Sequence, residues 1–167
     1  MSRGTKLRAP WVLLSVACGG FQDNPTHHYH LEIDPSFSSD QAQAILDAAS
    51  EWQQSSAEYV TFDGESAFTD TITFTPATAG GLDAEFGSGG YIGLTAYNGQ
   101  SANIQLLTTL DPQTFHQTAL HEIGHAIGLV HITPGNIMCA NTTCATLIVA
   151  CGDLYQLTGK NIPGCWP

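Results

Sequence analysis

An eleven-residue segment, HEIGHAIGLVH, places three histidines at spacings that suit metal binding. On a helix, where successive residues turn by about 100°, His121 and His125 lie one turn apart on the same face, so both imidazoles can bind one ion. Glu122 lies beside that face, where its carboxylate can reach a metal-bound water without becoming a ligand. Because glycine tolerates a positive φ, Gly128 can end the helix and let His131 return to the ion as a third ligand.

The chemistry of such a site follows from its ligands. Three neutral imidazoles with one position left for water are typical of catalytic rather than structural zinc. The ion lowers the pKa of its water towards about 7 and polarises a substrate carbonyl. Glu122 is the candidate general base, which takes the proton of the water and passes it to a leaving amine. Packing requires neither the glycine nor the third histidine, so the pattern predicts a catalytic zinc site.

Met138 follows His131 by seven residues. Alone it would be taken as a core residue, but together with the histidine segment it favours a zinc peptidase. The two features resemble the metzincin pattern HExxHxxGxxH followed by a methionine-containing turn, closest to a small bacterial matrixin-like catalytic domain. The resemblance covers most of residues 28–157. It implies that His121, His125 and His131 hold one zinc ion, with Glu122 as general base and Met138 as a non-ligating floor beneath the metal.

The same resemblance implies how a substrate binds. In metzincins the upper edge strand pairs antiparallel with an extended peptide, and residues 91–97 (YIGLTAY) resemble that strand. The candidate substrate-contacting residues are Gly93, Leu94, Thr95 and Ala96. The expected function is that of a zinc metalloendopeptidase acting on protein or peptide substrates. The alternatives are a catalytically silent zinc-binding surface lipoprotein, which the intact Glu122 argues against, and an enzyme for a non-peptide amide or ester.

Residues 76–90 form a glycine-rich stretch without periodicity, which predicts a loop. It has no histidine for the second, structural zinc of matrixins. Asp83 and Glu85 could bind Ca²⁺ there, although the alternating ligand pattern of a dedicated calcium loop is missing.

The elements that must position the site alternate between strand and helix patterns. Strands are predicted at 28–33, 59–62, 71–75, 91–97 and 103–107. Ser38, Ser39 and Asp40 offer N-caps for a first helix, whose apolar face is formed by Ala42, Ile45, Leu46, Ala49 and Trp52. Asp111 and Pro112 begin the helix that carries the histidines and runs to Gly128. The order predicts an α+β arrangement with a cysteine-rich C-terminal tail, and the resemblance to metzincins implies a metzincin-like (zincin) domain with a mixed twisted sheet.

The remaining histidines and tyrosines are expected to have structural roles. His27, His28 and His30 lack the neighbouring carboxylate or cysteine spacing of a second metal site. His116 is predicted to be a surface residue in the first turn of its helix. Tyr91, Tyr97 and Tyr155 are assigned to packing.

Residues 1–17 have a basic start and an apolar stretch too short to span a bilayer, which predicts an export signal. The sequence LSVAC resembles a bacterial lipobox, in which Cys18 is acylated; ordinary cleavage after Ala17 is the alternative. The predicted organisation is then a tether at 19–27 and a catalytic domain at 28–167. The expected location is extracytoplasmic, as a bacterial outer-membrane or cell-surface lipoprotein or a secreted protein.

Cysteine count and charge narrow the class further. If Cys18 carries lipid, four cysteines remain, which suits two disulfides whose pairing is open: Cys139, Cys144, Cys151 and Cys165. The net charge is −11, and three of the four Lys and Arg residues lie in the first eight positions. This excludes nucleic acid as a partner and limits membrane contact to the lipid anchor. A monomer is expected.

Overall fold

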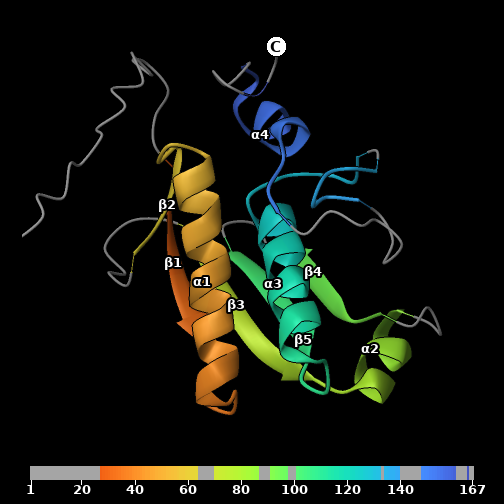
Figure 1. Ribbon diagram of the computed structural model, residues 1–167. Coiled ribbons are helices and arrows are strands. Elements are labelled where there is room, and N and C mark those ends of the chain that lie inside the picture. Colours follow the sequence, from red (N-terminus) through yellow and green to blue (C-terminus); the bar gives the residue numbers. More distant parts are fainter. Residues whose placement is uncertain are drawn as a thin grey trace, which may run out of the picture.

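The computed structural model describes residues 27–63, 70–86, 91–97, 101–132, 134–139, 148–160 and 165. The predicted signal, Cys18 and almost all of the tether lie outside these residues. The elements are β1 (His27–Ile33), α1 (Ser39–Ser55), β2 (Val60–Asp63), β3 (Asp70–Ala77), α2 (Ala79–Phe86), β4 (Gly93–Tyr97), β5 (Ser101–Leu107), α3 (Pro112–Ala126) and α4 (Cys151–Thr158) (Figure 1).

The sheet has the strand order β2-β1-β3-β5-β4. Four of these strands are parallel, and β4 pairs antiparallel with β5, with Thr95 opposite Ile104 and Tyr97 opposite Ala102. α1 and α3 lie side by side across one face of the sheet (Figure 1). This arrangement confirms the predicted α+β fold with a mixed sheet.

α1 begins at a capping box, in which Ser38 accepts from the Gln41 backbone and the Gln41 side chain accepts from the Ser38 backbone. Its buried residues are Ile45, Ala48, Ala49 and Trp52. Leu46 was expected on this face, but it is 45% exposed because it lies about 100° from Ile45 around the helix. The Trp52 indole donates to the carbonyl of Leu120 on α3 at 2.8 Å, so α1 fixes the position of the histidine-bearing helix.

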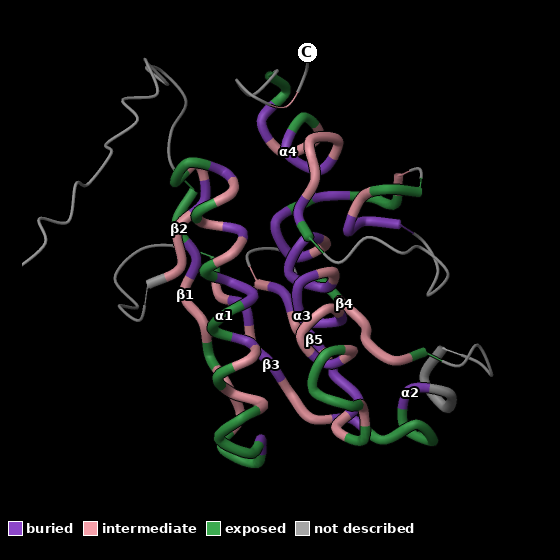
Figure 2. The backbone as a smooth tube through the Cα atoms, in the orientation of Figure 1, coloured by how far each residue is buried: buried purple, intermediate pink, exposed green. Residues whose placement is uncertain are grey.

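The hydrophobic core lies where α1, α3 and the sheet meet (Figure 2). Its largest fully buried side chains include Trp52, Phe74, Phe115 and Ile123. None of the helices in the described residues is long and apolar enough to cross a membrane.

Two predicted segments differ in the structure. The predicted loop at 76–90 instead contains the end of β3 and the helix α2, which is anchored by the fully buried Leu82 against Ala77 and Leu107. The side chains of Asp83 and Glu85, the calcium candidates, lie outside the described part. The C-terminal tail contains α4, which the cysteine pattern did not predict; a disulfide joins Cys151 at its start to Cys165.

Candidate metal centre

The histidine-bearing helix has well-defined ends. Its N-cap Asp111 accepts from the backbones of Gln113 and Thr114, as the sequence predicts. The helix ends at Ala126, and Gly128 has a φ of +99°. The Gly128 and Leu129 amides donate back to the carbonyls of His125 and Gly124, which is a Schellman turn that reverses the chain.

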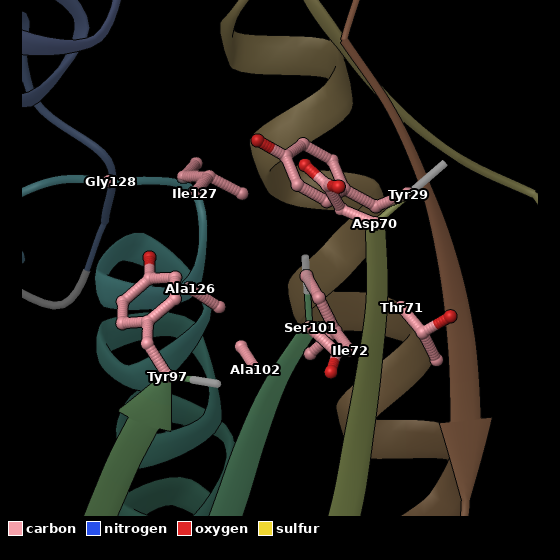
Figure 3. A pocket seen from close by; sticks show the side chains of 10 residues that line it. All are labelled: Tyr29, Asp70, Thr71, Ile72, Tyr97, Ser101, Ala102, Ala126, Ile127 and Gly128. Carbon is pink, nitrogen blue, oxygen red and sulfur yellow. The ribbon is translucent and has the colours of Figure 1, made fainter. Parts of the chain in front are cut away.

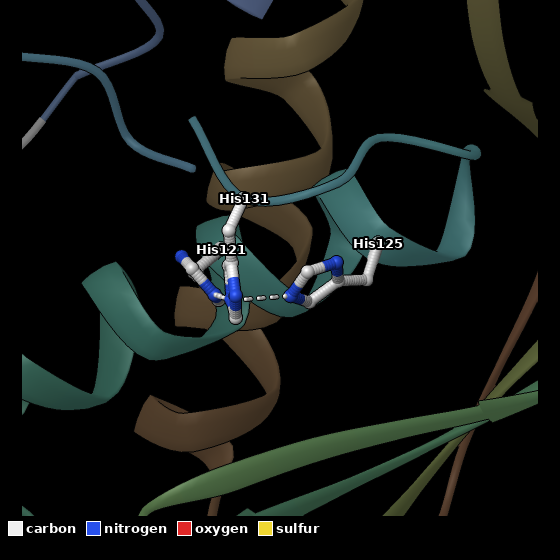
Figure 4. Close-up of side chains that lie close together, drawn as sticks. All are labelled: His121, His125 and His131. Atoms are coloured by element: carbon white, nitrogen blue, oxygen red, sulfur yellow. Dashed lines mark hydrogen bonds between the residues drawn. The ribbon is translucent and has the colours of Figure 1, made fainter. Parts of the chain in front are cut away.

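This reversal brings the three predicted histidines together (Figure 4). The His131 Nε2 atom lies 3.2 Å from His121 Nε2 and 3.1 Å from His125 Nε2. Zinc–nitrogen bonds of about 2.0–2.1 Å in tetrahedral geometry place neighbouring nitrogens roughly 3.3 Å apart. The spacing therefore fits one tetrahedral ion. Among the described residues, this is the one group of three or more His, Cys, Asp or Glu side chains that could hold a metal.

Backbone carbonyls orient two of these rings. The Nδ1 atom of His121 lies 2.7 Å from the Ile137 carbonyl, and that of His125 lies 2.9 Å from the Leu129 carbonyl. Each Nδ1–H donates to its carbonyl, which leaves Nε2 as the unprotonated, metal-facing nitrogen. Burial lowers the pKa of His121 to about 4 and also lowers the pKa of His125. Both rings are thus neutral near pH 7, as metal ligands must be.

Glu122 is 7% exposed and lies beneath β4. Burial raises the pKa of its carboxyl to about 7, against an opposing hydrogen bond from Thr95. The Thr95 Oγ1 atom donates to Glu122 Oε2 at 2.7 Å. A carboxylate at this position has the proton affinity of a base that works near neutral pH.

One face of β4 is built to approach α3. A Cβ atom on Gly93 would lie 2.5 Å from Thr118 Cγ2 and 2.9 Å from Glu122 Cγ, so this position requires glycine. Thr95, two residues after Gly93, donates a hydrogen bond to Glu122. The hydroxyl of Tyr97, two residues after Thr95, donates to the carbonyl of His125. The sequence predicts a packing role for Tyr97 and no contact between Thr95 and Glu122. The period-2 alternation of a strand is the signal that groups these three residues on one face.

Met138 is fully buried beneath α3. A Cβ atom on Gly124 would lie 2.2 Å from the Met138 Sδ atom, so the missing side chain makes room for the sulfur. The turn before Met138 contains Gly135 with a φ of +100°, and the Met138 carbonyl accepts from Ile132, the residue after His131. Met138 thus packs against Gly124, which lies between His121 and His125 on α3; its role as a floor beneath the metal stays a prediction.

A family model described as metallo-peptidase family M12B, reprolysin-like, matches residues 21–132, which is more than half of the chain. The chain belongs to this family. The matched range includes the sheet and the whole histidine segment. The chain is thus a member of a metallopeptidase family with the predicted metzincin-like (zincin) fold, and its histidine cluster fits zinc; matrixin-like specificity stays a prediction.

The chain is also similar to a solved structure of high choriolytic enzyme 1, a hatching enzyme zinc-protease from the medaka fish Oryzias latipes. The identity is 14% and the TM-score 0.45, over 62% of this chain and 44% of that chain. The chain therefore spans less than half of that structure. No curated protein matched.

α4 holds two parts of the metal centre through contacts that no sequence pattern predicts. Asp153 is fully buried and accepts from the backbones of Ile137, Met138 and Ala150 at 2.8–3.2 Å. Gln156 binds Val130, the residue before His131, at both backbone groups: its Oε1 accepts from the Val130 amide, and its Nε2 donates to the Val130 carbonyl at 3.0 Å. No pattern signalled these roles, because the cysteine-rich tail was not expected to be helical.

The other histidines lie away from the cluster. His116 was expected at the surface in the first turn, but it is half-buried against α1, near the Ala44 carbonyl and 3.4 Å from Glu51. His28 hydrogen-bonds Thr61. His30 lies 3.8 Å from Glu32.

Proposed function

We propose that the protein is a zinc metalloendopeptidase in which His121, His125 and His131 hold one catalytic ion. The observation that carries this proposal is that His131 Nε2 lies 3.1–3.2 Å from the Nε2 atoms of His121 and His125, whose rings are oriented by backbone carbonyls. Zinc bound there would supply a polarised water and a Lewis acid for the substrate carbonyl. Three ligands leave the fourth position open for this purpose.

Glu122 is the proposed general base. Its carboxylate is buried, has a pKa raised to about 7 and is oriented at Oε2 by the Thr95 hydroxyl. It takes a proton from the attacking water and delivers it to the leaving amine. Met138, which is buried against Gly124, would support the cluster from beneath without binding the ion.

The substrate is proposed to be a protein or peptide that binds along β4. Among the described residues, β4 pairs only with β5 and lies at the end of the sheet. An extended peptide can therefore add to its free edge as an antiparallel strand. The residues that would contact it are Gly93, Leu94, Thr95 and Ala96.

The protein is proposed to act outside the cytoplasm. The signal pattern at 1–17 and the acylation site at Cys18 support export to a bacterial outer membrane or cell surface, or secretion. The disulfide between Cys151 and Cys165 supports an oxidising compartment. In this proposal, residues 28–167 form a monomeric catalytic domain behind the tether.

The decisive experiment incubates the full chain, oxidised and loaded with one zinc ion, with a diverse peptide library and identifies products by mass spectrometry. We expect internal cleavage that disappears with a chelator and with Glu122→Ala, although this variant still binds zinc. Glu32→Ala, at an exposed acid on β1, is the matched control and should cleave normally. Tight zinc binding without cleavage would instead indicate a silent zinc-binding protein or a non-peptide substrate.

A further inference from the structure

The carbonyl of His125 receives two hydrogen bonds at the end of α3. The amide of Gly128 donates to it at 2.9 Å, as part of the turn that reverses the chain. The hydroxyl of Tyr97, from the edge strand β4, donates to the same oxygen. The last carbonyls of a helix have no partner within the helix, and a carbonyl oxygen has two lone pairs, so both donors can bind. Tyr97 thus caps the histidine-bearing helix from the sheet.

β4 reaches α3 at two backbone carbonyls that lie three residues apart. The Thr95 Oγ1 atom lies 3.0 Å from the carbonyl oxygen of Glu122. Tyr97, the next residue on the same face of the strand, reaches the carbonyl of His125. The first contact lies at the level of the candidate general base, and the second lies at the level of a metal ligand. The edge strand therefore holds the part of α3 that carries the site.

The surroundings of Tyr97 indicate that its hydroxyl matters more than its ring. The residue is 56% exposed, so burial of the ring adds little to the core. Its side chain lines a hollow of about 200 Å³ that is also bordered by Ala126, Ile127 and Gly128 (Figure 3). The turn after α3 therefore faces open space on one side. Where packing leaves such space, a directed hydrogen bond can hold a turn that close contacts do not.

His125 connects the Tyr97 contact with the rest of the turn. Its carbonyl accepts from Gly128, and its ring Nδ1 atom donates to the Leu129 carbonyl at 2.9 Å. Two residues after Leu129, the Nε2 atom of His131 lies 3.1 Å from that of His125. The backbone position of His125 therefore helps to decide where the third histidine returns.

We propose that Tyr97 is a positioning residue of the metal centre, whose hydroxyl favours the turn that returns His131 to the ion. The inference rests on the zinc site of the proposed function. Only a chain with this turn offers all three imidazoles, so the apparent Kd for zinc rises as the fraction of such chains falls. One hydrogen bond changes an equilibrium by about three- to tenfold. The Tyr97 hydroxyl strengthens zinc binding by this factor without contacting the ion.

The test measures the zinc affinity of the full, oxidised chain by competition with a chromogenic chelator. Tyr97→Phe removes the hydroxyl and keeps the ring, whereas Tyr97→Leu removes both. Both variants should lose about three- to tenfold in zinc affinity and should release zinc faster to the chelator. Tyr155→Phe, at a tyrosine on α4 that is 51% exposed, is the matched control and should bind zinc as the wild type does. Circular dichroism of the zinc-free variants checks that each one folds.

A second readout separates metal positioning from substrate contact. At saturating zinc, Tyr97→Phe should cleave peptides with kcat and KM within about twofold of the wild type, because the competent turn is then fully populated. At a zinc concentration near the Kd of the wild type, the same variant should lose most of its activity.

The outcomes separate this inference from the proposed function. Unchanged zinc affinity in Tyr97→Phe would overturn the inference and leave the endopeptidase intact. A loss of affinity in Tyr97→Leu alone would also overturn it, since the ring would then act through packing. A raised KM with unchanged zinc affinity would show that Tyr97 contacts the substrate instead. If the wild type binds zinc but cleaves no peptide, the proposed function fails, and the affinity comparison still decides the role of Tyr97.

Discussion

The Thr95 hydroxyl lies 2.7 Å from the Glu122 carboxylate and donates to it. The edge strand that would bind the substrate is thus hydrogen-bonded to the candidate general base on α3. A peptide adding to β4 would order the strand that orients Glu122. The contact between β4 and α3 therefore couples substrate binding to the positioning of the base.

Replacing Thr95 by valine tests this contact, because the change removes the hydroxyl and nearly preserves the shape. The Thr95 hydrogen bond lowers the pKa of Glu122, so its loss raises that pKa further. The base works when ionised, so activity is present above this pKa and is lost as pH falls through it. We expect the acidic limb of the kcat/KM profile to move to higher pH and the rate near pH 7 to fall about tenfold.

The pH profile of Thr73→Val serves as the control, since Thr73 on β3 hydrogen-bonds the exposed Glu32 on β1 and not Glu122. An unchanged acidic limb in Thr95→Val would show that the Thr95 hydroxyl does not set the pKa of Glu122.

Gly93→Ala should disrupt the site by steric clash alone. Its Cβ would meet Thr118 and Glu122 at 2.5 and 2.9 Å, so β4 or the carboxylate must move. We expect the unfolding free energy to fall by about 1–3 kcal/mol and kcat to fall at least about tenfold. Thermal unfolding and peptide cleavage measure the two effects. Gly80→Ala, in α2 with open space around it, should keep full activity.

Gln156→Ala should weaken zinc binding although Gln156 is not a ligand. The side chain holds both backbone groups of Val130, next to His131, so its loss frees the third histidine. Residues that orient metal ligands commonly contribute about tenfold or more to affinity, and we expect a tenfold loss in competition with a chelator. Gln43→Ala, on the exposed side of α1, is the control. Equal zinc affinity in both variants would contradict this role.

The stability of the protein should fall in alkali because of Tyr29. Its folded pKa is about 12, whereas an unfolded tyrosine titrates near 10. Between these values the unfolded chain loses the proton first, so stability decreases as pH rises from 10 to 12, by about 2–3 kcal/mol. Urea unfolding at several pH values should show this slope. The slope should become shallower in Tyr29→Phe, where only Tyr97, whose pKa burial also raises, still contributes, and it should persist in the control Tyr155→Phe, at an exposed residue.

Much of this architecture could be predicted because it follows from local sequence patterns within single helices and strands. The helical spacing of His121 and His125, the glycine after the helix and the strand alternation each reflect the periodicity of one element. The contacts that connect elements could not be predicted in the same way. The bond from Thr95 to Glu122 depends on sheet order, and the clamp of Gln156 on Val130 depends on where α4 docks. Leu46 shows the same limit, because its exposure depends on how α1 is rotated against the core.

The disulfide at the start of α4 affects how the metal centre forms. α4 carries Asp153, which holds the turn of Met138, and Gln156, which holds the chain before His131. The bond between Cys151 and Cys165 anchors this helix. A reductant that breaks this disulfide leaves the histidines chemically unchanged. It nevertheless loosens the helix that supports His131. We therefore expect the oxidised chain to retain metal better than the reduced chain, so that maturation proceeds from thiol oxidation to metal loading.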